Sequence, residues 1–300
     1  MRAPAKVNLH LSVGHVREDG FHDLTTVFQA IGLYDDVTLS RAEQPSLTVG
    51  GPASRAERDS VPLDASNLAL RAVALLAEHT GNHAAVAVHI RKGIPVAGGC
   101  AGGSADAAAA LVGADALWGT GLGKDELAAL GAQLGSDVPF SLHGGTALGT
   151  GRGEHLTPVL EQGDYVWVLA LSEGGLSTPL VYDELDRQRE NGPVGLVSDP
   201  SEVLAALRRG DPVALGRALG NDLQPAALVL RPLLRHVLDA GRSLGALGAV
   251  VSGSGPTVAL LARDDAHGVA LAAALHGQGV CTSIRRAAGP VPGARVLEAS

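Results

Sequence analysis

The first segment of the chain alternates apolar and polar side chains over residues 7–13. Alternation with a period of two predicts a half-buried strand, whose polar face would carry Lys6 and Asn8. Further short strands are predicted at residues 37–39, 47–49 and 86–90. Apolar residues at helical spacing predict a helix over residues 67–79, which Gly81 would end. Residues 52–64 are polar, proline-rich and of mixed charge, and they predict an exposed loop.

The rest of the chain continues to mix helices and strands. Helices are predicted at residues 125–134, 178–189, 201–209, 212–219, 225–240 and 264–275, and strands at 165–171, 249–251, 258–261 and 280–285. Neither half repeats a strict strand–helix–strand rhythm, so an α+β fold is favoured over a doubly wound sheet. The glycine-rich stretch 144–153 offers the best boundary, which gives predicted domains of residues 1–152 and 153–300.

Composition narrows the class of protein. With 46% hydrophobic and 18% charged residues, the chain can bury a sizeable core, which excludes a disordered protein. The net charge of −8 and the lack of a basic stripe argue against a nucleic-acid partner. Cys100 and Cys281 match no zinc spacing. The start of the chain has no apolar signal segment, and the uncharged run 243–262 has the pattern of strand, turn and strand. We therefore expect a cytoplasmic protein with no membrane partner.

Residues 95–105 form a glycine-rich loop between a predicted strand and a helix that we expect to run from Ser104 to Trp118. Glycines allow the backbone to approach a ligand closely, and the start of a helix offers unpaired N–H groups. Together they suit phosphate binding. The loop lacks the Gly-Lys-Ser/Thr ending of a Walker A motif and the spacing of a dinucleotide fingerprint. A flexible crossover is the alternative interpretation.

This loop resembles the phosphate-binding motif of the GHMP kinase superfamily. Two more segments resemble superfamily motifs in the same order along the chain, residues 4–9 and residues 253–257. Residues 20–24 and 135–140 resemble one branch of the superfamily in particular, and residues 146–148 and 221–225 fit the same branch. The resemblance therefore spans residues 4–257, nearly the whole chain.

The resemblance implies a fold, a reaction and partners. The expected fold has an N-terminal domain like ribosomal protein S5, a C-terminal ferredoxin-like domain and an active site in the cleft between them. The expected reaction is ATP-dependent phosphorylation of a hydroxyl on a small molecule that carries a cytidine diphosphate, with Mg²⁺ as the metal cofactor. The expected oligomeric state is a monomer or weak homodimer.

The resemblance also implies that Asp137 is the catalytic acid/base and that Lys6 is its partner. An aspartate can accept the proton of the attacking hydroxyl, and a nearby lysine can neutralise charge on the transferred group. Taken singly, Asp137 has another interpretation, a turn residue at the C-terminal end of a helix before Pro139. Lys6 likewise could be a solvent-exposed strand lysine.

Two sets of binding residues complete the expected site. The ATP-binding set comprises Pro95, Val96, Ala97, Gly98, Gly99, Cys100, Ala101, Gly102, Gly103, Ser104 and Ala105. The substrate-binding set comprises Asn8, Phe21, His22, Thr178, Tyr182, Gly253, Ser254 and Gly255. Phe21 and His22 match an aromatic–histidine pair that the resemblance assigns to the cytosine base, which would stack on the ring. The alternatives are an ordinary polar strand position for Asn8, a core anchor for Phe21, packing for Tyr182 and an unliganded hairpin for residues 253–257.

Some positions near the glycine loop depart from the usual motif or have two interpretations. Ser104 would donate to a phosphate or bind Mg²⁺, or would only cap the helix. Cys100, Ala101, Ala105 and Asp106 replace the residues usual in the motif, and Asp106 would either help to hold Mg²⁺ or favour the helix dipole. Lys92 is expected to be solvated. No dedicated metal-binding glutamate is evident, so Mg²⁺ would be held largely by the nucleotide.

Three other functions compete with the leading hypothesis. Another GHMP enzyme, such as a homoserine or mevalonate kinase, would have no base to stack on Phe21. A non-catalytic nucleotide-binding protein would be expected to lack Lys6 or Asp137, and both are present. A nucleic-acid-binding module is disfavoured by the acidic charge.

Overall fold

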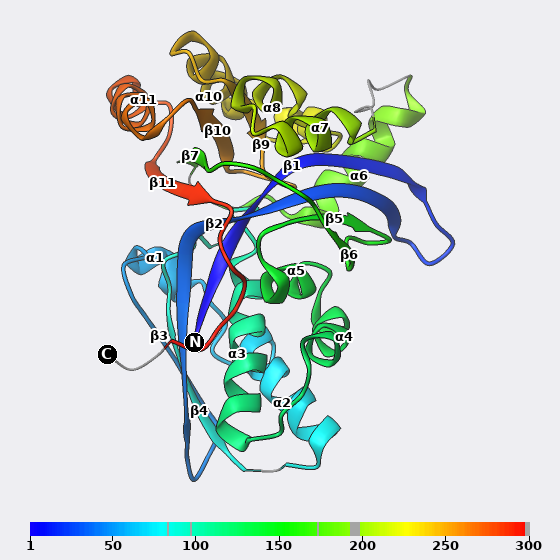
Figure 1. The fold of residues 1–300 in the computed structure, drawn as a ribbon, viewed down its shortest axis with the longest axis vertical. Coiled ribbons are helices and arrows are strands. Elements are labelled where there is room, and N and C mark those ends of the chain that lie inside the picture. Colours follow the sequence, from blue (N-terminus) through cyan, green and yellow to red (C-terminus); the bar gives the residue numbers. More distant parts are fainter. Residues whose placement is uncertain (83, 97, 173, 193–198, 298–300) are drawn as a thin grey trace.

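The computed structural model describes residues 1–82, 84–96, 98–172, 174–192 and 199–297, and these residues form two sheets, each flanked by helices (Figure 1). The first sheet contains β1 (Arg2–Val16), β2 (His22–Arg41), β3 (Ser46–Gly50), β4 (Val86–Arg91), β5 (Thr146–Thr150), β6 (His155–Pro158) and β8 (Gly220–Asn221). Its main order is β3-β4-β2-β1-β8, with β5 pairing with β2 and β6. The second sheet contains β7 (Tyr165–Leu171), β9 (Gly248–Val251), β10 (Val258–Ala262) and β11 (Ser283–Gly289), in the antiparallel order β11-β7-β10-β9.

The helices divide between the two sheets (Figure 1). The first sheet is accompanied by α1 (Arg55–Asp59), α2 (Leu68–Thr80), α3 (Gly102–Trp118), α4 (Lys124–Leu134) and α5 (Val138–His143). The second is accompanied by α6 (Thr178–Glu190), α7 (Ser201–Arg209), α8 (Pro212–Ala218), α9 (Gln224–Leu230), α10 (Leu233–Ser243) and α11 (Asp265–Gln278). Within the described residues none of these helices is both long and apolar enough to cross a bilayer. The α+β prediction is confirmed.

The central helix α3 packs against β1 and β2, and α2 packs on α3. The alanine tract 107–110 is completely buried in this helix. Small side chains allow the helix axis to approach the sheet closely, and Ala also has the highest helix propensity. The N-terminal end of α3 is thereby fixed next to β1, the strand that carries Lys6.

Several predicted elements are confirmed and several are wrong. The helix at 67–79 is present as α2, with Asn67 as its N-cap and Gly81 as its left-handed C-cap. The predicted loop 52–64 instead contains the short helix α1, whose N-cap Ser54 and Glu57 form a capping box. The predicted helix 225–240 is two helices, because Pro232 cannot donate an N–H to continue α9. Sequence reasoning also missed most of β2, which runs for 20 residues, and all of α5.

The two units are connected at more than one place. β8 pairs in parallel with β1, and Asn221 lies in this short strand. After β11 the chain returns to the first unit, where Arg295 forms a bridge with Arg2 (Figure 1). The predicted domain boundary between residues 152 and 153 falls between β5 and β6, which pair with each other. That boundary stays a prediction.

Candidate active site

The glycine loop leads directly into α3, and its last residues line a large cavity. α3 begins at Gly102, and its N-cap is Ala101 in the left-handed conformation with φ of 59°. Ser104 is therefore the third residue of the helix, and the interpretation of Ser104 as the N-cap is wrong. The N–H groups of the first helical turn point toward the loop, as an anion site requires.

The predicted ATP-binding residues divide into those that line this cavity and those that support it. The lining residues are Gly98, Gly99, Ala101, Gly102, Gly103 and Ser104. Pro95, Cys100 and Ala105 are buried behind them, and Val96 lines a smaller adjoining cavity. Burial raises the pKa of the Cys100 thiol. Ala97 lies outside the described residues.

The loop packs tightly against the turn between β9 and β10. The Ser252 hydroxyl donates to the Gly99 carbonyl at 3.1 Å. Gly99 has φ of +74°, and a Cβ added there would lie 2.2 Å from the Ser252 carbonyl oxygen. Because no side chain fits in that space, glycine is required for this close contact between the two units.

Lys6 and Asp137 meet in the cavity. The Lys6 Nζ lies 3.7 Å from Asp137 Oδ2, although Lys6 comes from β1 and Asp137 lies just before α5. The Lys6 side chain is 6% exposed and that of Asp137 is 33% exposed. The interpretation of Lys6 as a solvated strand lysine is therefore wrong. Asp137 is at the start of α5, so its interpretation as a residue at a helix C-terminus is also wrong.

A chain of hydrogen bonds fixes the direction of the Lys6 side chain. Its Nζ donates to Asn8 Oδ1 at 2.5 Å, Asn8 Nδ2 donates to Thr26 Oγ1 at 2.9 Å, and Thr26 donates to the His10 carbonyl at 2.8 Å. The ammonium also lies 5.6 Å from the centroid of the Phe28 ring. Lys6 is thus buried but has polar partners, as a buried charge requires.

The turn that follows β9 closes the cavity on the side of the second unit. Asn221 Nδ2 donates to the carbonyls of Val251 and Gly253, each at 2.7 Å. Gly253 has φ of +56°, and a Cβ there would lie 3.3 Å from Lys6 Nζ. The hydroxyls of Thr178 and Ser254 lie 2.9 Å apart. Gly253, Ser254, Gly255 and Thr178 all line the cavity, so the turn faces the same space as Lys6 and Asp137.

His22 and Tyr182 form a second polar and aromatic group in the same cavity. Their ring centroids are 5.1 Å apart. His22 Nδ1 contacts the Gly14 carbonyl at 2.9 Å, and its Nε2 lies 3.2 Å from Asp186 Oδ2 on α6. Burial, together with the negative charge of Asp137, raises the pKa of Tyr182. The Tyr182 phenol therefore keeps its proton and can donate a hydrogen bond.

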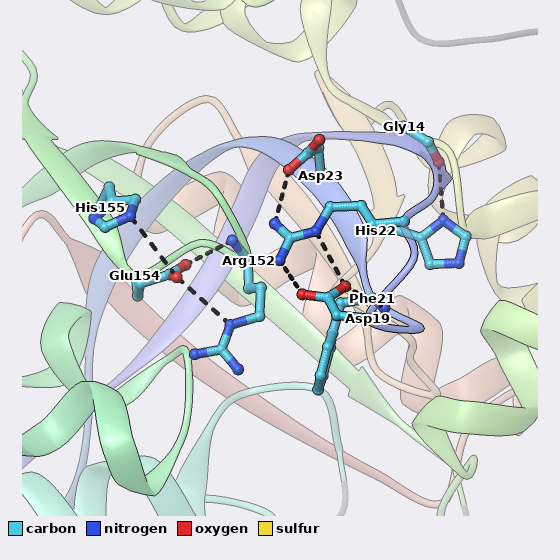
Figure 2. A network of polar contacts seen from close by, with 9 residues as sticks. Gly14, Asp19, Phe21, His22, Asp23, Arg152, Glu154 and His155 are labelled. Carbon is cyan, nitrogen blue, oxygen red and sulfur yellow. Dashed lines mark hydrogen bonds and ion pairs between the residues drawn. The ribbon is translucent and has the colours of Figure 1, made fainter.

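Phe21 lies at the open side of this group. It is 51% exposed, so its interpretation as a core anchor is wrong. The Arg152 guanidinium carbon lies 5.1 Å from the centroid of the Phe21 ring, and Figure 2 shows the two side chains next to each other. Arg152 follows β5, whereas Phe21 precedes β2.

The cavity as a whole has a volume of about 810 Å³, in the range of sites that enclose a ligand of substantial size. It is lined by both predicted catalytic residues and by all eight predicted substrate-binding residues. Three further carboxylates or cations on the lining were not predicted, namely Arg152, Asp183 and Asp186. Thr26 and Phe28 were also missed, because β2 was not recognised as a strand. The one signal that could have identified Arg152 is a cation between two glycines in the glycine-rich stretch 144–153.

A smaller cavity of about 190 Å³ adjoins the first and shares Leu68, Gly102 and Gly103 with it. Lys92 lies here, 2% exposed, with its Nζ 2.5 Å from Asp35 Oδ2 and 2.8 Å from Asp106 Oδ2. The expectation of a solvated Lys92 is therefore wrong. Burial disfavours the ammonium, but the two carboxylates outweigh it and raise the pKa of Lys92.

Asp106 has a different environment from that expected of a helix-dipole partner. Burial, and then the charge of Asp35, raise the pKa of Asp106 well above its ordinary value, although Lys92 opposes the shift. The described residues contain no group of three or more His, Cys, Asp or Glu side chains that could hold a metal ion.

Comparison with known proteins is consistent with this arrangement. The chain matches the GHMP kinases N terminal domain over residues 67–145 and the GHMP kinases C terminal domain over residues 203–281. A 4-diphosphocytidyl-2-C-methyl-D-erythritol kinase of Nocardia farcinica (strain IFM 10152) is 57% identical over 298 residues, which cover 99% of this chain and 96% of the relative.

Solved structures show the same relationship. The crystal structure of a 4-(cytidine 5'-diphospho)-2C-methyl-D-erythritol kinase superposes with a TM-score of 0.76 at 33% identity, covering 96% of this chain and 98% of that one. A mevalonate kinase of L. major in complex with R-mevalonate has a TM-score of 0.74 at 18% identity, over 98% of this chain and 96% of that one, and is similar in fold alone. With more than half of its residues identical to a relative over nearly the full length, and with both GHMP kinase domains, the chain belongs to the 4-diphosphocytidyl-2-C-methyl-D-erythritol kinases of the GHMP kinase superfamily.

Proposed function

We propose that this protein transfers the γ-phosphoryl group of ATP to the 2-hydroxyl of 4-diphosphocytidyl-2-C-methyl-D-erythritol, giving the 2-phosphate and ADP. This reaction belongs to the non-mevalonate pathway of isoprenoid precursor synthesis. The observation that carries the proposal is the contact of Lys6 with Asp137, 3.7 Å apart, in a cavity that the glycine loop and the His22–Tyr182 group also line.

Asp137 is the proposed proton acceptor for the attacking hydroxyl. The 2-hydroxyl is a tertiary alcohol, so the acceptor works in a crowded position and the orientation of the substrate matters more. The Lys6 ammonium places a positive charge beside the oxygen of the attacking hydroxyl, where it also attracts the incoming phosphoryl group. Asn8 already accepts from Lys6 and donates to Thr26, so its contribution includes holding the Lys6 ammonium in place.

The nucleotide phosphates are proposed to bind at the N-terminal end of α3. Gly102, Gly103 and Ser104 line the cavity there, and the helix dipole favours anions. The Ser104 hydroxyl and the phosphate oxygens form an oxygen donor set that suits Mg²⁺, a hard cation. When bound, Mg²⁺ neutralises charge that develops on the phosphates.

The cytosine base is proposed to bind beside His22, Phe21 and Tyr182. Aromatic stacking of a base contributes roughly 1–3 kcal/mol. Both ring nitrogens of His22 have protein partners, the Gly14 carbonyl and Asp186 Oδ2, which hold the imidazole in place beside the base. Homoserine and mevalonate carry no base, so this part of the cavity separates the proposed substrate from those of related kinases.

The direct test measures ADP production by the purified protein with ATP, Mg²⁺ and one of three acceptors: the cytidylylated methylerythritol, mevalonate or homoserine. We expect turnover with the first acceptor alone and its loss in Asp137→Ala. Asp125→Asn, an exposed position in the first turn of α4, is the matched control and should keep full activity. Turnover with mevalonate or homoserine, or none with any acceptor despite ATP binding, would reject the proposal.

A further inference from the structure

The described residues that line the main cavity carry more negative than positive side chains. Among the described residues that line it, Lys6 and Arg152 are the two with a positive side chain at neutral pH, against the three carboxylates of Asp137, Asp183 and Asp186. Lys6 is already bound to Asn8 and lies beside Asp137. A diphosphate between the nucleobase and the reacting hydroxyl adds negative charge to this acidic lining, and a cation near the nucleobase end would offset it.

Arg152 is held at that end by its backbone and by part of its side chain. Its N–H donates to Glu154 Oε2 at 2.6 Å, and its Nε lies 3.5 Å from Glu154 Oε1 (Figure 2). The turn is tied to the site because the Leu24 N–H donates to the Gly151 carbonyl at 2.7 Å. These contacts fix the start of the side chain and its Nε.

The rest of the guanidinium faces Phe21 and the cavity. Its carbon lies 5.1 Å from the Phe21 ring centroid, and the Arg152 side chain is 34% exposed. Among the described residues, neither terminal nitrogen makes a hydrogen bond. Because Nε is directed at Glu154, the edge formed by the two terminal nitrogens is the one without a hydrogen bond to a described residue. Such a planar edge is well matched to phosphate oxygens, which it can bind through two bonds at once.

We propose that Arg152 binds the diphosphate of the cytidylylated substrate while its guanidinium plane supports the Phe21 ring. This inference rests on the proposed function, since it takes the base to lie beside Phe21. Within a nucleotide the diphosphate follows the base and sugar directly, so a cation in contact with the base-stacking ring is within reach of it. Arg152 would thereby favour nucleoside diphosphates over nucleosides.

The test compares the affinities of cytidine and CDP, measured by calorimetry or as competitive inhibition, for the wild-type protein and for Arg152→Gln. Wild type should bind CDP more tightly than cytidine. Because a charge-assisted bond is lost, Arg152→Gln should weaken CDP binding by about tenfold or more and change cytidine binding far less. Arg152→Lys, which keeps the charge without the planar fork, should be intermediate.

Arg17→Gln is the matched control. Arg17 is in the same loop as Phe21 and pairs with Asp19 and Asp23, but it does not line the cavity. Its loss should leave the preference for CDP unchanged.

Each outcome has a defined meaning. If Arg152→Gln weakens cytidine and CDP equally, Arg152 acts only by supporting Phe21, and the inference is overturned. An unchanged CDP affinity in Arg152→Gln overturns it as well. A wild-type protein that does not prefer CDP to cytidine would overturn the proposed cytidine-diphosphate substrate and the inference together, whereas the first two results leave the proposed function intact.

Discussion

Replacing Lys92 by methionine removes the ammonium that lies between the carboxylates of Asp35 and Asp106. Methionine keeps most of the side-chain volume, so the substitution changes charge far more than packing. All three side chains are buried, with exposed fractions of 2% for Lys92, 0% for Asp35 and 5% for Asp106. The substitution therefore leaves two neighbouring carboxylates in the interior without a counter-charge.

Breaking a buried ion pair by removing one partner costs about 3–5 kcal/mol. Two features of the cluster place Lys92→Met near the lower end of this range. The Oδ1 of Asp35 keeps its bonds from the Gly93 and Ile94 N–H groups, at 2.7 and 2.9 Å. Asp106 can take up a proton, because its pKa is already raised by burial and by Asp35. We expect a loss of about 3 kcal/mol, of which about 1–2 kcal/mol returns in Lys92→Met/Asp106→Asn.

The measurement is urea unfolding followed by tryptophan fluorescence, in which Trp118 on α3 reports on the unit that contains Lys92. Arg91→Met is the control, because Arg91 is exposed and its contact with Asp36 is 3.7 Å long. It should change the free energy of unfolding by less than about 0.5 kcal/mol. A loss below about 1 kcal/mol in Lys92→Met, or no recovery in the double variant, would refute the reasoning.

Three further predictions concern the glycine loop and its surroundings. Ala101→Gly should stabilise the protein by about 0.5 kcal/mol in thermal unfolding, because relief of the left-handed strain exceeds the added entropy of the unfolded chain; a lower Tm would contradict this. Gly99→Ala should lose about 2–4 kcal/mol of stability and most kcat/KM, because its Cβ meets the Ser252 carbonyl; wild-type stability and kinetics would count against that contact. The pKa of Asp106 is higher in the folded protein than its ordinary value of 3.8, so the folded state binds this proton more tightly than the unfolded chain does. The free energy of unfolding of the wild type therefore falls as the pH rises above 3.8. Asp106→Asn should therefore become more stable relative to wild type between about pH 4 and pH 7 in urea titrations, and a difference that stays constant with pH would argue against it.

The alternation of apolar and polar residues predicted β4 correctly but missed most of β2. Residues 86–90 alternate clearly because β4 has one exposed face, and the prediction is confirmed. Residues 27–31 of β2 are all buried, so both faces are covered and no alternation is left to detect. β1 is covered on both faces as well, so Lys6 is buried although it lies on the polar face of the alternation.

One predicted helix is wrong at its N-terminal end. Ser104 is a typical N-cap residue, but α3 begins two residues earlier, after Ala101 in a left-handed conformation that alanine rarely adopts. The conformational preferences of the residues near Ser104 could not predict this start of α3, because contacts of the loop with β1 and with Ser252 impose the left-handed conformation of Ala101.

The candidate site was predicted better than the elements that carry it. Motif resemblance selected residues as distant as Asn8 and Ser254, and both line one cavity. Their roles stay predictions. Arg152 and Asp186 could not be selected in this way, because their importance comes from proximity to Phe21 and His22 in space.

The return of the chain from β11 to the first unit has a consequence for how the protein is made. The Arg2 and Arg295 backbones exchange hydrogen bonds of 2.9 and 3.0 Å, and the Gly145 N–H donates to the Val291 carbonyl at 2.7 Å. During synthesis the segment that supplies Val291 and Arg295 leaves the ribosome well after β1 and β2, which it covers. The first unit is therefore incompletely hydrogen-bonded until this segment has been made, and we expect it to depend on chaperones until then.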